Sequence, residues 1–504
     1  MINSYMEKEL ERLDYLKKFA QEIQERNDKA IKDGEEAIRH PINAFLLIKG
    51  MTADWKKVVK IMQSNSANDI IHNMTRQRSI NRINYPTEED LSGAVIGLLR
   101  LQDTYQMNTK DIAEGKILNS QIRTVALTAG DCFEIGLVAY KADDYYHTIM
   151  WMQEARERVE KEIIPTANLE DILEYLAFSL YKQGNLKRAL LLTDELYRIN
   201  PDHPRAKGNI RWYEDLLKDD GVQHIDMRRD IPPISNMRRE NDMQHTYEEL
   251  CRQKVPVKTK VQSRFYCYYK MDRPYLRLAP FKVEIIRQNP LVVLFHDIIS
   301  NEESRIIEML AIPKLKRSLA RNPATGKFEV MSGRTSKSAR LSPTEHEIVK
   351  RIDRRLELAT NLEIETAEDL QIQNYGIGGH YKPHLDCALK AKQYFDKLET
   401  GNRIATILIY MTEPEVGGWT VFVNLKTSVP CIKNAALFWY NLMRSGEVDM
   451  RSRHGSCPVL TGIKWTAIKW FHERGQEWRR PCSLNQFDQE RYVGDLGAFK
   501  RNIV

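Results

Sequence analysis

Residues 380–390 read "HYKPHLDCALK" and directly follow the glycine-containing stretch "NYGIGG" of residues 374–379. His384 and Asp386 are two residues apart, and on a strand the side chains at i and i+2 point to the same face. An imidazole and a carboxylate aimed at one point supply two of the three ligands of a 2-His-1-carboxylate triad for non-haem Fe(II). Taken alone, the pair also fits an ordinary capped loop. The metal-site hypothesis therefore depends on a second histidine further along the chain.

His454 is the candidate for that histidine, and it lies in "RSRHGSCPVLTGIKWTAIKWF", residues 451–471. It follows His384 by 70 residues, which is enough chain for several strands of a barrel to return to the metal. Fe(II) held by His384, Asp386 and His454 would keep three coordination positions open for a keto-acid cosubstrate and O₂. Oxidative decarboxylation of the keto acid could then drive hydroxylation of an unactivated C–H bond.

Lys464 follows ten residues after His454. On an alternating strand it shares its face with Thr466, Ile468 and Trp470, whereas Lys469 points the other way. A lysine on an apolar face is unfavourable unless a buried anion neutralises it. The distal carboxylate of 2-oxoglutarate is such an anion, so we predict that Lys464 is buried at the cosubstrate site and that Lys469 is solvated.

The β-strand texture of this half of the chain begins after residue 250. Short β-branched or aromatic runs such as "RIATILIYM", "WTVFV" and "AALFWYNLM" are separated by turns. That pattern predicts a small antiparallel barrel or jelly roll.

The N-terminal half is predicted to be helical. Residues 1–33 carry apolar side chains at helical spacing among many Glu and Lys, which indicates a coiled-coil or helix-pairing segment, or else a solvated helix packed on its own domain. These side chains are Tyr5, Leu10, Leu13, Leu16 and Phe19. Helical periodicity continues to about residue 125.

Residues 130–215 resemble tetratricopeptide hairpins. Ala177, Gly184, Ala189 and Pro201 occupy the offsets at which such a unit needs small residues and a stop. Aromatic residues are concentrated here, and most are expected in the core. Those on a concave surface would suit an extended proline-rich peptide. The candidate peptide contacts are Tyr140, Tyr146, Tyr175, Tyr181 and Trp212.

Composition narrows the function classes. The 504-residue chain is long enough for about three domains, and its net charge of +7 comes without a dense basic block, so nucleic acid is not predicted as a partner. No apolar run approaches the length of a membrane span, and the N-terminus lacks the apolar core of a secretory signal. None of the seven cysteines forms a CxxC motif.

Longer motifs resemble the α subunits of animal procollagen prolyl 4-hydroxylases. They include "YGIGGHYKPHLD" (375–386) and "GNRIATILIYMTEPEVGGWTVF" (401–422) in the β half, and "HPINAF" (40–45) and "LLRLQDTY" (98–105) in the helical half. The resemblance covers nearly the whole chain and implies 4-hydroxylation of proline in X-Pro-Gly repeats. Two alternatives stay open: the same chemistry on another secreted proline-rich protein, and a non-catalytic subunit that only binds proline-rich chains.

The resemblance also implies an organisation. It predicts a helical dimerisation domain over 1–125, a peptide-substrate-binding domain over 130–215, a linker over 216–250, a double-stranded β-helix catalytic domain over 251–490 and a tail over 491–504. The implied setting is the lumen of the endoplasmic reticulum, as an α₂β₂ tetramer with protein disulfide isomerase as the β subunit, and with ascorbate to restore oxidised iron.

Residue roles follow from the same resemblance. It implies iron ligation by His384, Asp386 and His454, and binding of the 2-oxoglutarate C5 carboxylate by Lys464. Tyr375 and Thr420 match positions near the cosubstrate. Arg403 and Trp470 match positions at the proline entrance or cosubstrate pocket, with plain packing an equal alternative for Trp470. Implied covalent features are disulfides Cys251–Cys267 and Cys457–Cys482 and glycosylation of Asn73.

Some positions depart from the family pattern. Val423 stands where the family has proline, Trp419 lies inside a glycine-rich motif, and Trp212 replaces a common tyrosine. We expect these changes to affect substrate preference and not the catalytic set. Because no signal precedes Met1, we also expect a truncated or mis-started chain, and the last residues, "FKRNIV", contain no retention tetrapeptide.

Overall fold

The computed structural model describes residues 2–62, 86–118, 124–238, 241–253, 265–321, 328–389, 400–485 and 488–494. Two compact units divide the chain, the first spanning Met1–Glu240 and the second Asn241–Val504.

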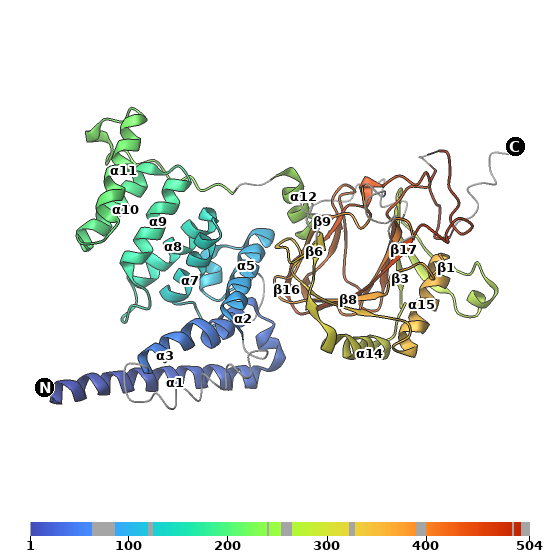
Figure 1. Cartoon of the computed structure of the whole chain (residues 1–504), viewed down its shortest axis with the longest axis horizontal. Helices are drawn as coiled ribbons and strands as arrows, with labels where there is room; N and C mark the ends of the chain where they lie inside the picture. Colours follow the sequence, from blue (N-terminus) through green and yellow to red (C-terminus); the bar gives the residue numbers. More distant parts are fainter. Residues whose placement is uncertain are drawn as a thin grey trace. The chain divides into compact units, whose positions relative to one another are not determined.

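The first unit is helical (Figure 1). Its helices are α1 (Ile2–Ile38), α2 (Pro41–Lys49), α3 (Trp55–Met62), α5 (Glu88–Tyr105), α6 (Thr109–Ala113), α7 (Ala129–Lys141), α8 (Tyr145–Val159), α9 (Leu169–Lys182), α10 (Leu186–Ile199) and α11 (Ala206–Asp219), with a π-helical turn at Gly50–Asp54 and a 3₁₀ turn at His224–Asp226. Capping boxes start α5, through Thr87 and Asp90, and α7, through Thr128 and Asp131. Each box satisfies backbone N–H groups that a helix start leaves without a partner.

Helices α7 to α11 stack as successive hairpins, as the sequence predicts. Gly136 on α7 allows a close approach to α8, because a Cβ atom there would lie 3.0 Å from the side chain of Met152. Gly184 turns the chain between α9 and α10 with a φ of +81°, a conformation that glycine adopts without strain. Gly136 therefore permits close packing in one hairpin, and Gly184 provides the turn in the next.

The stretch predicted as a linker, 216–250, is helical at both ends, and its middle part packs against helices of the first unit. Helix α11 runs to Asp219, and α12 spans Asp242–Cys251 in the second unit. Between them, Arg228 binds Asp194 and Glu214, with nitrogen–oxygen distances of 2.7 and 2.8 Å. The lack of hydrophobic periodicity there reflects polar docking onto α10 and α11.

A buried histidine joins α5 to α8. His147 Nε2 lies 2.9 Å from Asp103 Oδ1, and His147 Nδ1 lies 2.6 Å from Asp144 Oδ2. Arg238 Nε also lies 3.1 Å from Asp103 Oδ2. Burial alone would lower the pKa of His147, but the hydrogen bonds and charges of the two carboxylates outweigh it and raise the pKa to about 9. The imidazolium is therefore the stable form at neutral pH.

This raised pKa predicts a pH dependence of stability. A folded-state pKa above the unfolded value contributes stability that is complete below pH 6.5 and is lost as pH rises through about 9. The free energy of opening of α5 and α8 should fall by about 3 kcal/mol across that window. Hydrogen exchange of the intact chain, corrected for intrinsic rates, measures this. His147→Gln should flatten the profile and His224→Gln, at an exposed site, should not; equal profiles for both variants would contradict the assignment.

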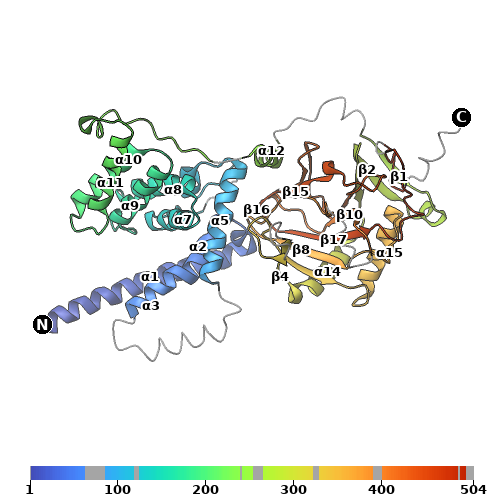
Figure 2. The same ribbon diagram turned by 45° about the horizontal axis from the view of Figure 1, so that its top comes forward.

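The second unit is rich in β-strands (Figure 2): within the described residues they form a nine-stranded sheet, a four-stranded sheet and the two-stranded sheets β11-β16 and β5-β6. Its strands are β1 (Cys267–Lys270), β2 (Phe281–Gln288), β3 (Leu291–His296), β4 (Lys316–Arg317), β5 (Ala320–Arg321), β6 (Phe328–Glu329), β7 (Lys337–Leu341), β8 (Leu370–Tyr375), β9 (Tyr381–His384), β10 (Arg403–Tyr410), β11 (Val416–Gly417), β12 (Thr420–Phe422), β13 (Thr427–Val429), β14 (Ala436–Tyr440), β15 (His454–Ser456), β16 (Val459–Thr461) and β17 (Lys464–His472). Its helices besides α12 are α14 (Asn301–Ala311) and α15 (Glu347–Thr360), with 3₁₀ turns at Pro274–Arg277, Ile312–Lys314 and Met450–Ser452.

The strands are arranged as a jelly roll. A major sheet has the order β1-β2-β3-β14-β10-β17-β8-β7-β4, and a minor sheet has the order β13-β12-β15-β9. Apolar side chains of β3, β10 and β14 pack against β12 and β13 between the two sheets. The opposite face of the major sheet packs against α14 and α15. The central strands of the major sheet, such as β10 and β14, are therefore covered on both faces.

Because α15 covers one face of the major sheet, the prediction made for Lys469 is wrong. Lys469 was expected to be solvated, but it is buried, and its Nζ lies 2.8 Å from Asp353 Oδ2 on α15. The strand alternation was right, since Ala467 and Phe471 share its face. Period two tells which residues share a face, but it does not tell that a helix remote in sequence covers that face.

We expect Lys469→Met to destabilise the second unit by about 3–5 kcal/mol, because it leaves Asp353 as an unpaired buried carboxylate. The midpoint of urea unfolding, followed by tryptophan fluorescence, measures the loss. The double variant Lys469→Met/Asp353→Leu should recover most of it, because no charge is then buried alone. A double variant as unstable as the single one would show that packing, and not the charge, explains the loss.

The cysteine pairing inferred from the family resemblance is wrong in this structure. Cys251, at the end of α12, forms a disulfide with Cys457, which follows β15, across a sequence separation of 206 residues. Cys267 and Cys482 are exposed free thiols. Proximity in sequence misled the prediction: α12 packs beside β12 and β13 and thereby places Cys251 against Cys457.

The same packing explains two departures from the family pattern. Val423 and Trp419 pack in a cluster with Tyr247, Cys251 and Cys457, where α12 meets the minor sheet. Neither residue lines the cavity described below. Their position ties them to the docking of α12.

Candidate active site

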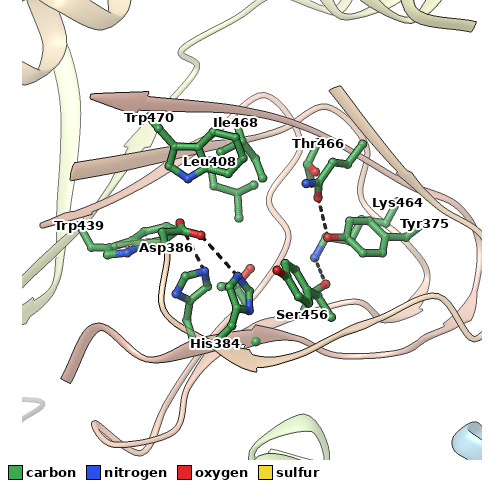
Figure 3. A pocket seen from close by; sticks show the side chains of 15 residues that line it. Tyr375, His384, Asp386, Leu408, Trp439, Ser456, Lys464, Thr466, Ile468 and Trp470 are labelled. Carbon is green, nitrogen blue, oxygen red and sulfur yellow. Dashed lines mark hydrogen bonds and ion pairs between the residues drawn. The ribbon is translucent and has the colours of Figure 1, made fainter. Parts of the chain in front are cut away.

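The two histidines of the predicted triad face each other on neighbouring strands. His384 ends β9, His454 begins β15, and the two are paired across the antiparallel ladder. Asp386 lies in the bend after β9, so the expectation that one strand carries both His384 and Asp386 is corrected: the bend brings the carboxylate to the imidazoles. The metal-ligating atoms of the three residues lie within 4.8 Å of one another (Figure 3).

Hydrogen bonds orient the three side chains. His384 Nδ1 lies 2.9 Å from the carbonyl oxygen of Lys382, and His454 Nδ1 lies 2.9 Å from that of Ser452. A carbonyl only accepts, so each Nδ1 carries the proton and each Nε2 presents its lone pair, as metal-binding histidines do. The Nε2 atoms lie 3.4 Å (His384) and 3.7 Å (His454) from the carboxylate oxygens of Asp386.

The protonation states suit a cation. Burial lowers the pKa of His454 to about 4, so its imidazole is neutral at neutral pH. Burial would raise the pKa of Asp386, but the two histidines outweigh it and hold the pKa well below its usual range. Neutral imidazoles and an ionised carboxylate are the ligand forms that Fe(II) requires. The donor set therefore fits a non-haem iron.

Lys464 forms the other end of the same cavity. Its side chain is only 1% exposed, and Nζ donates to the carbonyl oxygen of Gly418 at 2.5 Å and to Ser456 Oγ at 2.8 Å. Burial lowers the pKa of Lys464. Within the described residues its hydrogen-bond acceptors are uncharged, so a carboxylate that enters the cavity would meet an unneutralised ammonium. Gly418 has a φ of +71°, and a Cβ atom there would lie 3.3 Å from Lys464 Cδ.

The cavity between these two ends has a mixed lining. Two of its buried polar atoms, Thr466 Oγ1 and Trp470 Nε1, have no hydrogen-bond partner within the described part of the chain. Such orphaned groups fit a polar ligand. The full lining is Gln373, Tyr375, Tyr381, His384, Asp386, Leu408, Thr420, Trp439, His454, Gly455, Ser456, Lys464, Thr466, Ile468 and Trp470 (Figure 3).

Three family models match successive parts of the chain. A prolyl 4-hydroxylase alpha-subunit N-terminal region matches residues 1–119, a prolyl 4-hydroxylase peptide-substrate-binding domain matches 129–219, and the 2OG-Fe(II) oxygenase superfamily matches 370–472. Prolyl 4-hydroxylase subunit alpha-1 of Caenorhabditis elegans is 52% identical over 502 residues, which cover 99% of this chain and 89% of that one. The chain belongs to the prolyl 4-hydroxylase alpha subunits.

A second curated relative supports the assignment. Prolyl 4-hydroxylase subunit alpha-1 of Homo sapiens is 40% identical, over 97% of this chain and 92% of its own. Among solved structures, the viral collagen prolyl hydroxylase of Paramecium Bursaria Chlorella virus-1 is 24% identical, covering 36% of this chain and 94% of its own, with a TM-score of 0.29. As a family member, this alpha subunit is a 2-oxoglutarate- and Fe(II)-dependent dioxygenase.

The predicted cosubstrate residues of this prolyl 4-hydroxylase lie in two places. Tyr375, Thr420 and Trp470 line the cavity. Tyr375 donates through its hydroxyl to Gln373 at 2.6 Å, and Lys464 Nζ lies 5.2 Å from the Tyr375 ring centroid. Arg403 is not among the residues that line the cavity. Its guanidinium stacks on Trp470, which does line it, at 3.9 Å from the ring centroid.

Arg403 also binds Glu368 and the main chain of Asp386, at 2.5 and 3.1 Å. Burial would raise the pKa of Glu368, but a hydrogen bond from His472 and the charge of Arg403 lower it to about 2. Glu368 is thus ionised and pairs with Arg403. The arrangement holds Trp470 and the Asp386 bend together.

Sequence reasoning did not single out Ser456, Gln373 or Trp439 for the site. Ser456 lies two residues after His454 on β15, so strand alternation would have found it. Gln373 enters from β8 and Trp439 from β14, and neither residue shares a short sequence motif with the triad. Only the sheet order brings these two strands to the cavity.

The predicted peptide contacts lie on the helices of the first unit. Tyr140 and Tyr175 have ring centroids 4.8 Å apart, and Tyr181 and Trp212 have centroids 4.6 Å apart. Phe178 bridges the two pairs through Tyr140 and Tyr181. Tyr146, on α8, stacks its ring edge-on against His147 instead. Asn73 lies outside the described residues.

No helix in the described part of the chain is both long and apolar enough to cross a membrane.

Proposed function

We propose that this prolyl 4-hydroxylase alpha subunit hydroxylates C4 of proline in X-Pro-Gly repeats of collagen-like chains. The reaction consumes peptidyl proline, 2-oxoglutarate and O₂ and forms peptidyl 4-hydroxyproline, succinate and CO₂. The observation that carries the proposal is one cavity with the His384–Asp386–His454 triad at one end and the buried ammonium of Lys464 at the other. The chemistry of the two ends suits a dicarboxylate keto acid, because the triad would hold a metal and Lys464 would pair with a carboxylate.

Each residue has a proposed role. His384, Asp386 and His454 would hold Fe(II), and Lys464 would pair with the C5 carboxylate of 2-oxoglutarate. Iron and 2-oxoglutarate, when bound, supply the oxidising chemistry. The apolar side chains of Leu408, Ile468 and other lining residues exclude water from the reacting groups.

The first unit would hold the substrate. An aromatic surface suits polyproline II chains, which lose little conformational entropy on docking. The ring cluster of Tyr140, Tyr175, Tyr181 and Trp212 supplies such a surface, and the family model that matches this region is a peptide-substrate-binding domain. Weak contacts along a repetitive substrate raise its local concentration at the catalytic unit.

We propose the organisation expected from the resemblance: dimerisation through residues 1–125, peptide binding by 130–215, catalysis by 251–490. The assembly would be an α₂β₂ tetramer with protein disulfide isomerase in the endoplasmic reticulum, with ascorbate to restore oxidised iron and glycosylation at Asn73. The Cys251–Cys457 disulfide supports an oxidising compartment.

Formation of 4-hydroxyproline in a (Pro-Pro-Gly)n peptide tests the proposal. The chain would be co-expressed with protein disulfide isomerase behind a secretory signal and supplied with Fe(II), 2-oxoglutarate and ascorbate. Mass spectrometry should find the hydroxyl on the proline that precedes glycine. A soluble assembly that decarboxylates 2-oxoglutarate but hydroxylates only a non-collagen proline-rich peptide would replace the collagen assignment. Loss of decarboxylation as well would favour a binding-only subunit.

A further inference from the structure

A chain of hydrogen bonds runs from the major sheet to the metal-ligand carboxylate. Trp439 Nε1 donates to Asn441 Oδ1 at 2.9 Å, and Asn441 Nδ2 donates to Thr406 Oγ1 at 2.9 Å. Thr406 Oγ1 in turn donates to Asp386 Oδ2 at 2.8 Å. Thr406 and Asn441 are fully buried, and Trp439 is nearly so. Water is therefore not available to replace any of these bonds.

The direction of this chain is set by the chemistry of its members. An indole N–H can only donate, so the Asn441 side chain must turn its oxygen toward Trp439 and its NH₂ toward Thr406. The Thr406 oxygen then accepts from that NH₂, and its single hydrogen is directed to the carboxylate of Asp386, which only accepts when ionised. Bonds aligned in this way polarise one another.

The sheet register explains why these residues meet. Thr406 on β10 pairs with Trp439 on β14, and Asn441 follows directly after β14. The main-chain N–H of Asn441 donates to the carbonyl of Ile404 at 2.8 Å, which continues the contact between the two segments past the end of β14. The donor to Asp386 is thus mounted on two central strands of a sheet that is covered on both faces.

Asp386 itself lies in a bend outside the strand ladder, where Arg403 holds its main-chain carbonyl and Thr406 holds its carboxylate. Without a donor at Oδ2, its carboxylate could rotate about the Cβ–Cγ bond. We propose that Thr406 and Asn441 are positioning residues that hold the Asp386 carboxylate in its metal-binding orientation and so set the iron affinity of the site. The inference rests on the iron site described above and does not depend on which peptide is the substrate.

The test is the metal affinity of the intact assembly, measured without turnover. Metal-free protein would be titrated with Fe(II) under anaerobic conditions, and separately with Mn²⁺, in competition with a chelator. Thr406→Val keeps the shape and removes the hydroxyl, and we expect metal affinity to fall by about 10- to 100-fold. Thr406→Ser restores the donor and should bind metal like the unmodified chain.

Asn441→Leu removes the bond that directs the Thr406 hydroxyl but leaves the hydroxyl in place. We expect a smaller loss of affinity, about fivefold, the effect of one neutral hydrogen bond. We expect Thr406→Val to bind metal most weakly, Asn441→Leu to be intermediate and Thr406→Ser to bind most tightly. This order is specific to the proposed chain of hydrogen bonds.

A matched control separates positioning from stability. Thr360 is equally buried, on α15, and its hydroxyl donates to the carbonyl of Leu356 at 2.8 Å. Thr360→Val should lower the unfolding temperature by a similar amount and leave metal affinity unchanged. The proposal is overturned if Thr406→Val binds metal within twofold of the unmodified chain, if Thr406→Ser is as weak as Thr406→Val, or if Thr360→Val weakens binding equally.

Discussion

His454→Ala should abolish iron binding and proline hydroxylation together. His454 is a buried triad member whose Nε2 faces the Asp386 carboxylate at 3.7 Å, and alanine leaves only His384 and Asp386 for the metal. Loss of a supporting outer residue already weakens metal sites by about 10- to 100-fold, so loss of a ligand should exceed about 100-fold. Anaerobic Fe(II) titration measures the affinity, and 4-hydroxyproline analysis measures the activity.

His296→Ala is the matched control. His296, at the end of β3, pairs with Glu284 at 2.8 Å and does not line the cavity. Its replacement should leave iron binding unchanged. Retention of tight Fe(II) binding by His454→Ala, in protein that unfolds at the unmodified temperature, would remove His454 from the ligand set.

Lys464→Ala should raise the KM for 2-oxoglutarate by roughly 30- to 5,000-fold, the range that corresponds to loss of one partner of a buried charge pair. The reason is that Nζ is the cation at this end of the cavity, and the Gly418 carbonyl and the Ser456 hydroxyl that accept from it carry no charge. The apparent KM for the peptide should change far less. Direct binding of 2-oxoglutarate to the Mn²⁺-loaded protein gives the affinity without turnover.

Two further variants serve as controls for the Lys464→Ala result. Lys464→Arg keeps the charge, but the wider guanidinium does not fit where Gly418 already approaches Lys464 Cδ, so we expect partial recovery at most. Lys282→Ala removes an exposed lysine that pairs with Asp297 and should have no effect. A Lys464→Ala protein with normal 2-oxoglutarate affinity and impaired peptide binding would assign Lys464 to the substrate instead.

Local spacing and residue chemistry made His384, Asp386 and His454 a candidate triad, and the motifs shared with the prolyl 4-hydroxylases turned that candidate into a firm prediction. His384 and Asp386 are close in sequence, and the face of Lys464 follows from the period of a strand. The prediction of one regular strand through both residues was wrong, since Asp386 reaches the triad from a bend after β9 and not from the strand itself. That error did not change the choice of ligands, because a metal site depends on where the side chains come together and not on which element carries each one.

In the helical half, too, some features were predictable from the sequence and others were not. Ala177 and Ala189, which the sequence placed at the small positions of a hairpin, are buried, whereas Gly184 has open space around it and instead turns the chain between α9 and α10. The docked segment around Arg228 was not predictable, because its partners Asp194 and Glu214 lie on two separate helices. A segment held by polar contacts needs no regular spacing of apolar residues, so its sequence does not show where it binds.

By itself the sequence determined the residue types of the site, the alternation of β17 and the helical and β halves. Only the tertiary structure decided that Lys469 is buried against Asp353, that Cys251 bonds Cys457, and that Thr406 supports Asp386. The physical reason is common to all three. Periodicity reports which side chains share a face, whereas what covers that face depends on elements distant in sequence, whose approach is set by the packing of the whole unit.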